Sequence, residues 1–155
     1  ISTLVFTLGP RINAAGRIEH GSKAVELLTC EDEKLADEFA LAINDTNLQR
    51  RDLDLGITTE AFEILDNDNL SSTRRTTVLF NEKWHKGVIG IVASRLIDKY
   101  YRPTIILTES EGKITGSARS VREYDVYSAI EKCSGLLEQF GGHKFAAGLT
   151  LKKEN

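Results

Sequence analysis

The 155-residue sequence contains no methionine, two cysteines, two prolines and a single tryptophan. The absence of methionine even at position 1 indicates a piece excised from a longer protein. Cys30 and Cys133 lie far apart and form no Cys-x-x-Cys unit, so we expect reduced thiols in a cytoplasmic protein. No apolar run approaches the ~20 residues of a membrane span, and no basic-then-apolar leader opens the chain, which argues against a membrane protein.

The sequence also lacks an excess of charge of one sign. Twenty Lys and Arg residues against 23 Asp and Glu residues give a net charge of −3, whereas nucleic-acid-binding domains are often strongly basic. With 41% hydrophobic and 28% charged residues, the composition is that of an ordinary folded protein. A nucleic-acid site would therefore have to be a local patch on a nearly neutral body.

The first half of the chain is dominated by one long helical pattern. The opening segment, Ile1–Ser22, is short apolar and then turn-like, and a short helix is expected over 23–28. A pattern with three- and four-residue spacing then runs from Glu31 to about Leu65. Its apolar stripe consists of Leu35, Phe39, Ala42, Ile43, Leu53, Ile57, Ala61, Ile64 and Leu65. A helix of ~35 residues spans roughly 50 Å, which suggests a connector between two bodies.

The second half reads as a small α/β domain after a polar break at Asp66–Thr73. A buried strand, a helix and a second strand in succession imply parallel pairing through a crossover, and the hairpin that follows adds an antiparallel neighbour. We expect strands at 76–80, 104–108, 114–118 and 145–151 and helices at 87–100 and 125–133. The predicted fold class is thus α/β: a long connecting helix followed by a small α/β domain with a mixed β-sheet flanked by helices.

Motifs for catalysis are missing from the sequence. Asp66–Asn69 is not followed by the glycine and glutamate of a calcium loop, and Gly112-Lys113 has no glycine five residues ahead, as a phosphate loop requires. His20, His85 and His143 share no helix-face spacing and no acidic cluster, so no metal site and no cofactor are expected within this chain. No serine or cysteine lies in a nucleophile elbow. The chain is expected to lack chemistry of its own.

Two stretches combine arginine with small residues. In Gly9–Arg17, Arg11 and Arg17 flank Asn13, and guanidinium groups there would supply paired donors to a phosphate. The alternative is a turn with two solvated arginines.

In Gly116–Ser120, Ser117 and Arg119 are two residues apart and would project from one face of a strand. A hydroxyl and a guanidinium on one face suit a phosphate oxygen. The alternative is an edge strand with an exposed arginine.

The third stretch, Phe140–Gly148, places His143 directly after a glycine pair. A turn at Gly141 and Gly142 would leave backbone N–H groups open to an anion, and the imidazole would add a donor. The alternative is a helix-ending turn with a packed histidine.

The segment Trp84–Gly87 adds a further candidate contact. His85 precedes a predicted helix whose N-terminus favours negative charge. Trp84 belongs either to the core or to a surface on which a base stacks.

Together, GPRINAAGR, WHKGVIGIVASRL, GSARS and FGGHKFAAG resemble the RecJ family of single-stranded-DNA-specific 5′→3′ exonucleases, members of the DHH phosphoesterase superfamily. That family joins a catalytic domain with two Mn²⁺ or Mg²⁺ ions to a DHH-associated domain through a long helix. The present sequence departs from the pattern because it contains neither the Asp-His-His triplet nor the metal-binding aspartate motifs. The Gly-Gly-His motif alone also occurs in oligoribonucleotide and cyclic-dinucleotide phosphodiesterases.

The resemblance implies a division of the chain and roles for particular residues. Residues 1–20 would be the tail of the catalytic domain, 21–73 the connecting helix region and 74–155 the DHH-associated, substrate-binding domain. Ser117 and Arg119 would hold the DNA at its 5′-terminal phosphate. His85 would either contact the substrate or organise the start of its helix. The scissile phosphate would face Gly141, Gly142 and His143, with His143 as a phosphate stabiliser, and the catalytic side of the cleft would be lined by Arg11, Asn13 and Arg17.

The function implied is a fragment of a single-stranded-DNA exonuclease that is inactive alone, with Mn²⁺ or Mg²⁺ required by the full-length enzyme. Its expected partner is single-stranded DNA, together with unidentified DNA repair or replication proteins, in cytoplasmic DNA repair and recombination. Two alternatives stay open. One is a fragment of an oligoribonuclease or cyclic-dinucleotide phosphodiesterase, and the other is a non-catalytic interaction module that binds a partner through its helix.

Overall fold

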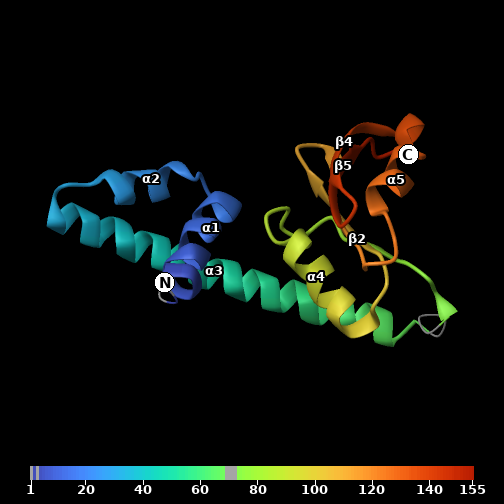
Figure 1. The fold of residues 1–155 in the computed structure, drawn as a ribbon, viewed down its shortest axis with the longest axis horizontal. Helices are drawn as coiled ribbons and strands as arrows, with labels where there is room; N and C mark the ends of the chain where they lie inside the picture. The colour runs from blue at the N-terminus through green and yellow to red at the C-terminus, as the bar shows by residue number, and fades with distance from the viewer. Residues whose placement is uncertain (1, 3, 69–72) are drawn as a thin grey trace. The chain divides into compact units, whose positions relative to one another are not determined.

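The computed structural model describes residues 2, 4–68 and 73–155 (Figure 1). The chain divides into two compact units, Ile1–Leu53 (the N-terminal unit) and Asp54–Asn155 (the C-terminal unit), and the division falls inside helix α3. Part of the polar break expected at Asp66–Thr73 lies outside the described residues, since 69–72 are not among them.

The N-terminal unit is helical from its start. A π-helical turn η1 (Leu4–Leu8) precedes α1 (Gly9–Ile18) and α2 (Ser22–Thr29). The expectation that the arginine-containing stretch is turn-like was wrong, because that stretch is α1. Pro10 lies in the first helical turn, where its missing N–H has no intrahelical acceptor to serve. Ala15 then packs with Ala24 and Ile43 in a small core.

Helix α3 (Glu33–Asp66) confirms the long helix. Its buried stripe is more polar than predicted. Ile43, Ile57, Ala61 and Leu65 are buried as expected, but Leu35, Leu53 and Ile64 are exposed. The 3.6-residue period instead buries the polar side chains Thr46, Asn47, Asp54 and Thr58. These side chains can be buried because hydrogen bonds satisfy them, as when Thr46 Oγ1 donates to the Ala42 carbonyl at 3.0 Å.

The C-terminal unit contains a mixed sheet, as predicted, with five described strands rather than the four expected, in the order β1-β2-β3-β5-β4. Among the described strands only the β1–β2 pair is parallel, and α4 (Ile89–Tyr100) connects these two strands. The strands are β1 (Thr77–Phe80), β2 (Thr104–Ser110), β3 (Lys113–Arg119), β4 (Leu137–His143) and β5 (Ala146–Leu151). Helix α5 (Val126–Glu131) begins at Asp125, whose carboxylate accepts the Ser128 N–H at 3.0 Å, and a short 3₁₀ turn η3 (Ser134–Leu136) follows it.

Two expectations about the sheet were wrong. The strand at 76–80 is not buried: β1 is an edge strand, and Val78 and Phe80 are 58% and 52% exposed. Gly141, Gly142 and His143 form no turn either. They are the last three residues of β4 and pair with β5, and the turn consists of the next two residues.

The two faces of the sheet carry different helices. On one face Ala118 and Ala147 pack with Val126 and Ile130, so that α5 covers this side. Arg119 projects from the opposite face, which α4 partly covers. We call this second face the site face.

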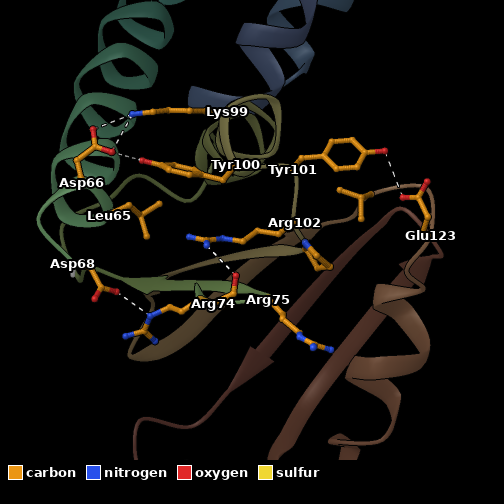
Figure 2. Close-up of a pocket in the computed structure, with 12 residues that line it drawn as sticks. Leu65, Asp66, Asp68, Arg74, Arg75, Lys99, Tyr100, Tyr101, Arg102 and Glu123 are labelled. Carbon is orange, nitrogen blue, oxygen red and sulfur yellow. Dashed lines mark hydrogen bonds and ion pairs between the residues drawn. The ribbon is translucent and has the colours of Figure 1, made fainter. Parts of the chain in front are cut away.

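Carboxylates of α3 anchor its second half to the C-terminal unit. Asp54 is 2% exposed and accepts two hydrogen bonds from Arg95, at 2.9 and 2.7 Å. At the end of the helix, Asp66 accepts from Lys99 Nζ at 2.9 Å and from the Tyr100 hydroxyl at 2.6 Å (Figure 2). The pKa of Asp66 is lowered, first by the Tyr100 hydrogen bond and then by Lys99. This part of α3 is therefore a structural element of the C-terminal unit.

A third carboxylate of α3 fixes the loop between β1 and α4. Glu60 accepts hydrogen bonds from the Trp84 indole N–H and the Asn81 amide, both at 2.7 Å. Trp84 is 3% exposed, so the structure selects the core alternative for this residue, and its ring is not available to stack on a base. The segment that carries His85 is thereby held against α3.

None of the helices in the described part of the chain combines the length and the apolar character that a membrane crossing demands.

Candidate nucleic-acid interface

Ser117 and Arg119 meet the first turn of α4 on the site face. Arg119 Nη1 donates to Ser117 Oγ at 3.0 Å and to the Ala118 carbonyl at 2.8 Å, and both side chains are half-buried. The α4 residue that faces them is Gly90. A Cβ atom there would lie 2.7 Å from Arg119 Nη2 and 2.9 Å from Ser117 Oγ. Glycine at this position is what allows the guanidinium to lie against the helix.

The first turn of α4 adds to the positive potential of the guanidinium. Val88 is the N-cap residue, and its side chain has no acceptor for the N–H groups that open the helix. These N–H groups and the helix dipole favour an anion. A helix N-terminus, a hydroxyl and a guanidinium together make a site suited to a phosphate group.

The strand pairing of the sheet aligns this site with residues of β4. Arg119 pairs with Ala146, which pairs with His143, and in the next row Ser117 pairs with Gly148, which pairs with Gly141. Residues opposite each other in antiparallel strands project to the same face, and neighbouring strands lie about 4.8 Å apart. Arg119 and His143 therefore lie on one face, roughly 10 Å apart at the backbone. Between them the floor is small residues.

The glycines of this region serve two different purposes. Gly142 has a φ of +147°, and a Cβ there would lie 2.5 Å from Ala147 Cα, so the fold itself requires glycine. A Cβ at Gly141 would have no described atom within 4 Å, and one at Gly148 would meet only the Gly116 carbonyl at 3.9 Å. Packing against the described residues therefore does not require glycine at Gly141 or Gly148. We call the open surface over these two residues the glycine floor.

The two histidines differ in their surroundings. His143 is exposed at the end of β4, and its Nδ1 accepts the Phe145 N–H at 3.3 Å, which leaves Nε2 as the outward nitrogen. His85 Nδ1 accepts the Gly87 N–H at 3.1 Å, and its carbonyl accepts the Val88 N–H at 3.1 Å. His85 therefore organises the start of α4, and a substrate contact for it stays a prediction.

The remaining predicted site residues lie in the N-terminal unit. Arg11 donates to Asn44 Oδ1 at 3.1 Å and to the Thr7 carbonyl at 2.8 Å, so this side chain has a packing role between α1 and α3. Asn13 and Arg17 are exposed and, four residues apart, share one face of α1. Their role in a cleft stays a prediction.

A separate pocket, of about 810 Å³, lies at the C-terminal end of α4 (Figure 2). Two of its arginines are held by neighbouring groups: Arg74 pairs with Asp68 at 2.9 Å, and Arg102 Nε donates to Thr77 Oγ1 at 2.7 Å. The pKa of Tyr100 is raised, first by burial and then by its hydrogen bond to Asp66. Because these groups bind one another, we interpret the pocket as part of the packing around α3.

Within the described ranges, no three His, Cys, Asp or Glu side chains gather as a metal site would require. The residues present do not fit the two-metal site that the resemblance implies for a catalytic domain. No hydrolytic step is therefore assigned to them.

Comparison with known proteins places the chain in a family. Residues 74–155 match the DHHA1 domain family, so the chain belongs to it. Over its whole length the chain is similar to the single-stranded-DNA-specific exonuclease RecJ of Bacillus subtilis, with 43% identity over 99% of this chain and 20% of the relative. RecJ of Escherichia coli is 35% identical, over 99% of this chain and 28% of the relative.

Solved structures agree with these relatives. RecJ of Thermus thermophilus in complex with Mg²⁺ superposes with a TM-score of 0.86 at 30% identity, covering 98% of this chain and 23% of that one. Exonuclease RecJ bound to manganese gives a TM-score of 0.83 at 29% identity, over 98% of this chain and 37% of the other. The predicted resemblance to the RecJ exonucleases is confirmed. The chain spans 20% and 28% of the length of the two curated relatives named above.

Sequence reasoning missed Gly90 and considered Gly148 only as part of the Phe140–Gly148 stretch, without assigning it to the site. Both are glycines inside regular elements, where glycine weakens the element. That conflict was the available signal, because a glycine in a helix or strand interior often marks a close approach of other groups.

Proposed function

We propose that this chain holds the 5′-terminal phosphate of single-stranded DNA, as the substrate-binding part of a RecJ-type exonuclease. The observation that carries the proposal is the meeting of Ser117 and Arg119 with the first turn of α4 at Gly90. The relatives named above are single-stranded-DNA-specific exonucleases, which supports DNA as the ligand. The complete protein would then require Mg²⁺ or Mn²⁺, held by residues outside this chain.

Each residue of the site would make a different contact with the DNA. Arg119 supplies charge and paired donors to the terminal phosphate, and Ser117 adds a hydroxyl. The glycine floor lets the strand approach the sheet closely. His143 presents Nε2 to the following phosphate, at the far side of that floor. Roles for Arg11, Asn13 and Arg17 in binding the DNA belong to the same proposal. So do a place in cytoplasmic DNA repair and recombination and contacts with repair proteins, which rest on the family resemblance alone.

The test is equilibrium binding of the complete protein, with divalent metal removed, to fluorescent oligothymidylate carrying a 5′-phosphate or a 5′-hydroxyl. A hydrogen bond to a charged group contributes about 1.5–3 kcal/mol. Arg119→Ala should therefore weaken binding of the phosphorylated strand roughly 10- to 100-fold. The same variant should reduce the salt dependence by about one phosphate contact.

Arg122→Ala is the matched control, because Arg122 is an exposed arginine three residues further along and outside the site. It should bind as the unaltered protein does. Equal affinities for the two strand ends, or equal effects of the two variants, would refute the proposal. Cleavage of dinucleotides in preference to long single strands, with metal restored, would favour the oligoribonuclease alternative.

A further inference from the structure

A depression of about 300 Å³ adjoins the glycine floor. Gly141 and Gly148 form one border of it, and the polar side chains Thr115, Thr150 and Gln139 form the next row. In that row Thr150 pairs with Thr115 on one side and with Gln139 on the other, and the row is two residues removed from Ser117, Gly148 and Gly141. All three side chains therefore project from the site face.

The hydrogen-bonding groups of this row are available to a ligand. The side chains of Thr115, Thr150 and Gln139 make no hydrogen bond to any residue that the structure describes. Threonines of the same face on the neighbouring strand behave differently: Thr104 Oγ1 donates to the Arg102 carbonyl at 3.0 Å and Thr108 Oγ1 to the Trp84 carbonyl at 2.5 Å. The row that borders the glycine floor is thus polar without a structural reason inside the fold.

The position of the depression fits the nucleoside part of a nucleotide. A nucleotide with its 5′-phosphate at Arg119 and its 3′-phosphate near His143 crosses the glycine floor, because these two residues stand in one row across β3, β5 and β4. Strands two apart are separated by roughly 10 Å, a span that one nucleotide can bridge once the side chains reach inward. Its base then points along the strands, either toward the turn that follows Arg119 or toward the depression. A volume of about 300 Å³ can hold a nucleobase.

We propose that this depression receives the base of the 5′-terminal nucleotide, with Thr115, Thr150 and Gln139 as its hydrogen-bonding partners. The proposal rests on the proposed function, since it presupposes that the terminal phosphate is held at Arg119. Hydroxyl groups rotate and a glutamine amide both donates and accepts, so these side chains serve any of the four bases. The site therefore recognises the presence of a base and is indifferent to its identity.

The test compares two 5′-phosphorylated oligonucleotides, one with an ordinary terminal nucleotide and one with an abasic terminal nucleotide. The complete protein binds each, with metal removed. The variant is Thr115→Val with Thr150→Val, which removes two hydroxyls at nearly constant shape and keeps residues that favour strands. Thr76→Val is the control, because Thr76 is an exposed threonine outside the depression.

The unaltered protein should bind the ordinary terminus roughly tenfold more tightly than the abasic one, and the double variant should bind both alike. The salt dependence should stay the same in the double variant, because no charge is removed. The control variant should keep the tenfold preference.

Three results would overturn the inference. A base preference that survives in the double variant would leave the proposed function standing and remove the base pocket. An equal loss for both oligonucleotides would show that the threonines act on the phosphate grip or on the fold. If the unaltered protein does not bind the phosphorylated strand, the proposed function fails, and the base pocket fails with it.

Discussion

Alanine substitutions at Gly141 and Gly142 distinguish the roles of these two neighbouring glycines. We expect the fold to need Gly142, and we expect Gly141 to leave room for a ligand. At Gly142 the backbone has a φ of +147°, and the new Cβ would lie 2.5 Å from Ala147 Cα and 2.9 Å from Ala147 Cβ. Backbone strain of this kind costs about 1–3 kcal/mol, and overpacking adds about 1–3 kcal/mol. Gly142→Ala should therefore destabilise the β4–β5 pair by roughly 2–6 kcal/mol.

Gly141→Ala should have the opposite effect on the fold. Its Cβ would have no described neighbour within 4 Å, and alanine in a strand is favoured over glycine by about 0.5–1 kcal/mol. The methyl group would instead stand on the glycine floor in the path of the strand. We expect roughly tenfold weaker binding of 5′-phosphorylated single-stranded DNA, from a clash of about 1–3 kcal/mol that relaxation of the ligand partly relieves.

Hydrogen exchange of the complete protein, followed on peptides that cover 137–151, measures the first effect. Exchange in Gly142→Ala should be roughly 30-fold faster or more, since each 1.4 kcal/mol is a factor of ten, and exchange in Gly141→Ala should be unchanged or slower. Oligonucleotide binding measures the second effect. Faster exchange in Gly141→Ala, or a stable Gly141→Ala protein with full affinity, would refute the assignment of these two glycines.

Three further variants test other contacts. Gly90→Ala should displace the guanidinium of Arg119 and weaken binding of the phosphorylated strand roughly tenfold while the helix remains stable, because alanine is a better helix former; an unchanged affinity in a binding titration would contradict this. Glu60→Gln should destabilise the protein by about 1–3 kcal/mol, since it weakens the acceptor of the buried Trp84 indole, and thermal unfolding that matches the unaltered protein would count against it. Asp66→Asn should lower the stability at neutral pH and lose that effect in acid: the lowered pKa means that the stabilisation is present above the ordinary value of 3.8 and disappears as the pH falls through the folded-state pKa. A stability difference that persists at pH 2 in urea unfolding would exclude this carboxylate as its source.

The sequence predicted the order of elements well where the periodicity was long or the punctuation clear. The long helix, the crossover helix after a strand, and the hairpin before Arg119 all appear in place, because their patterns extend over several turns or end at glycine or proline. The edge position of β1 was not predictable from its own residues. Val78 and Phe80 look like a buried strand, and only the strand order shows that they lie at the exposed edge of the sheet.

The candidate site was predictable in part. Ser117 and Arg119 follow from strand alternation, which needs only local sequence. The joining of Arg119 to His143 depends on β5 lying between β3 and β4, a long-range pairing that no local pattern contains. For the same reason the glycine pair was misread as a turn, since Gly142 is required by its contact with a strand that follows it in the chain. Asp54 was overlooked because its burial depends on Arg95, 41 residues away.

The low charge of this chain bears on how an end of DNA could be selected. A basic groove attracts any stretch of a strand, because every phosphate adds the same attraction. If this chain binds DNA as proposed, its net charge of −3 would gain little from internal phosphates, and its affinity would depend on groups that only an end can reach. A terminal phosphate carries more charge than an internal one, and under the proposed function it would bind Arg119 beside the first turn of α4. The glycine floor and uncharged threonines then add contacts without adding affinity for the rest of the strand. On this reasoning, raising the positive charge beside the site would increase binding and reduce the preference for ends.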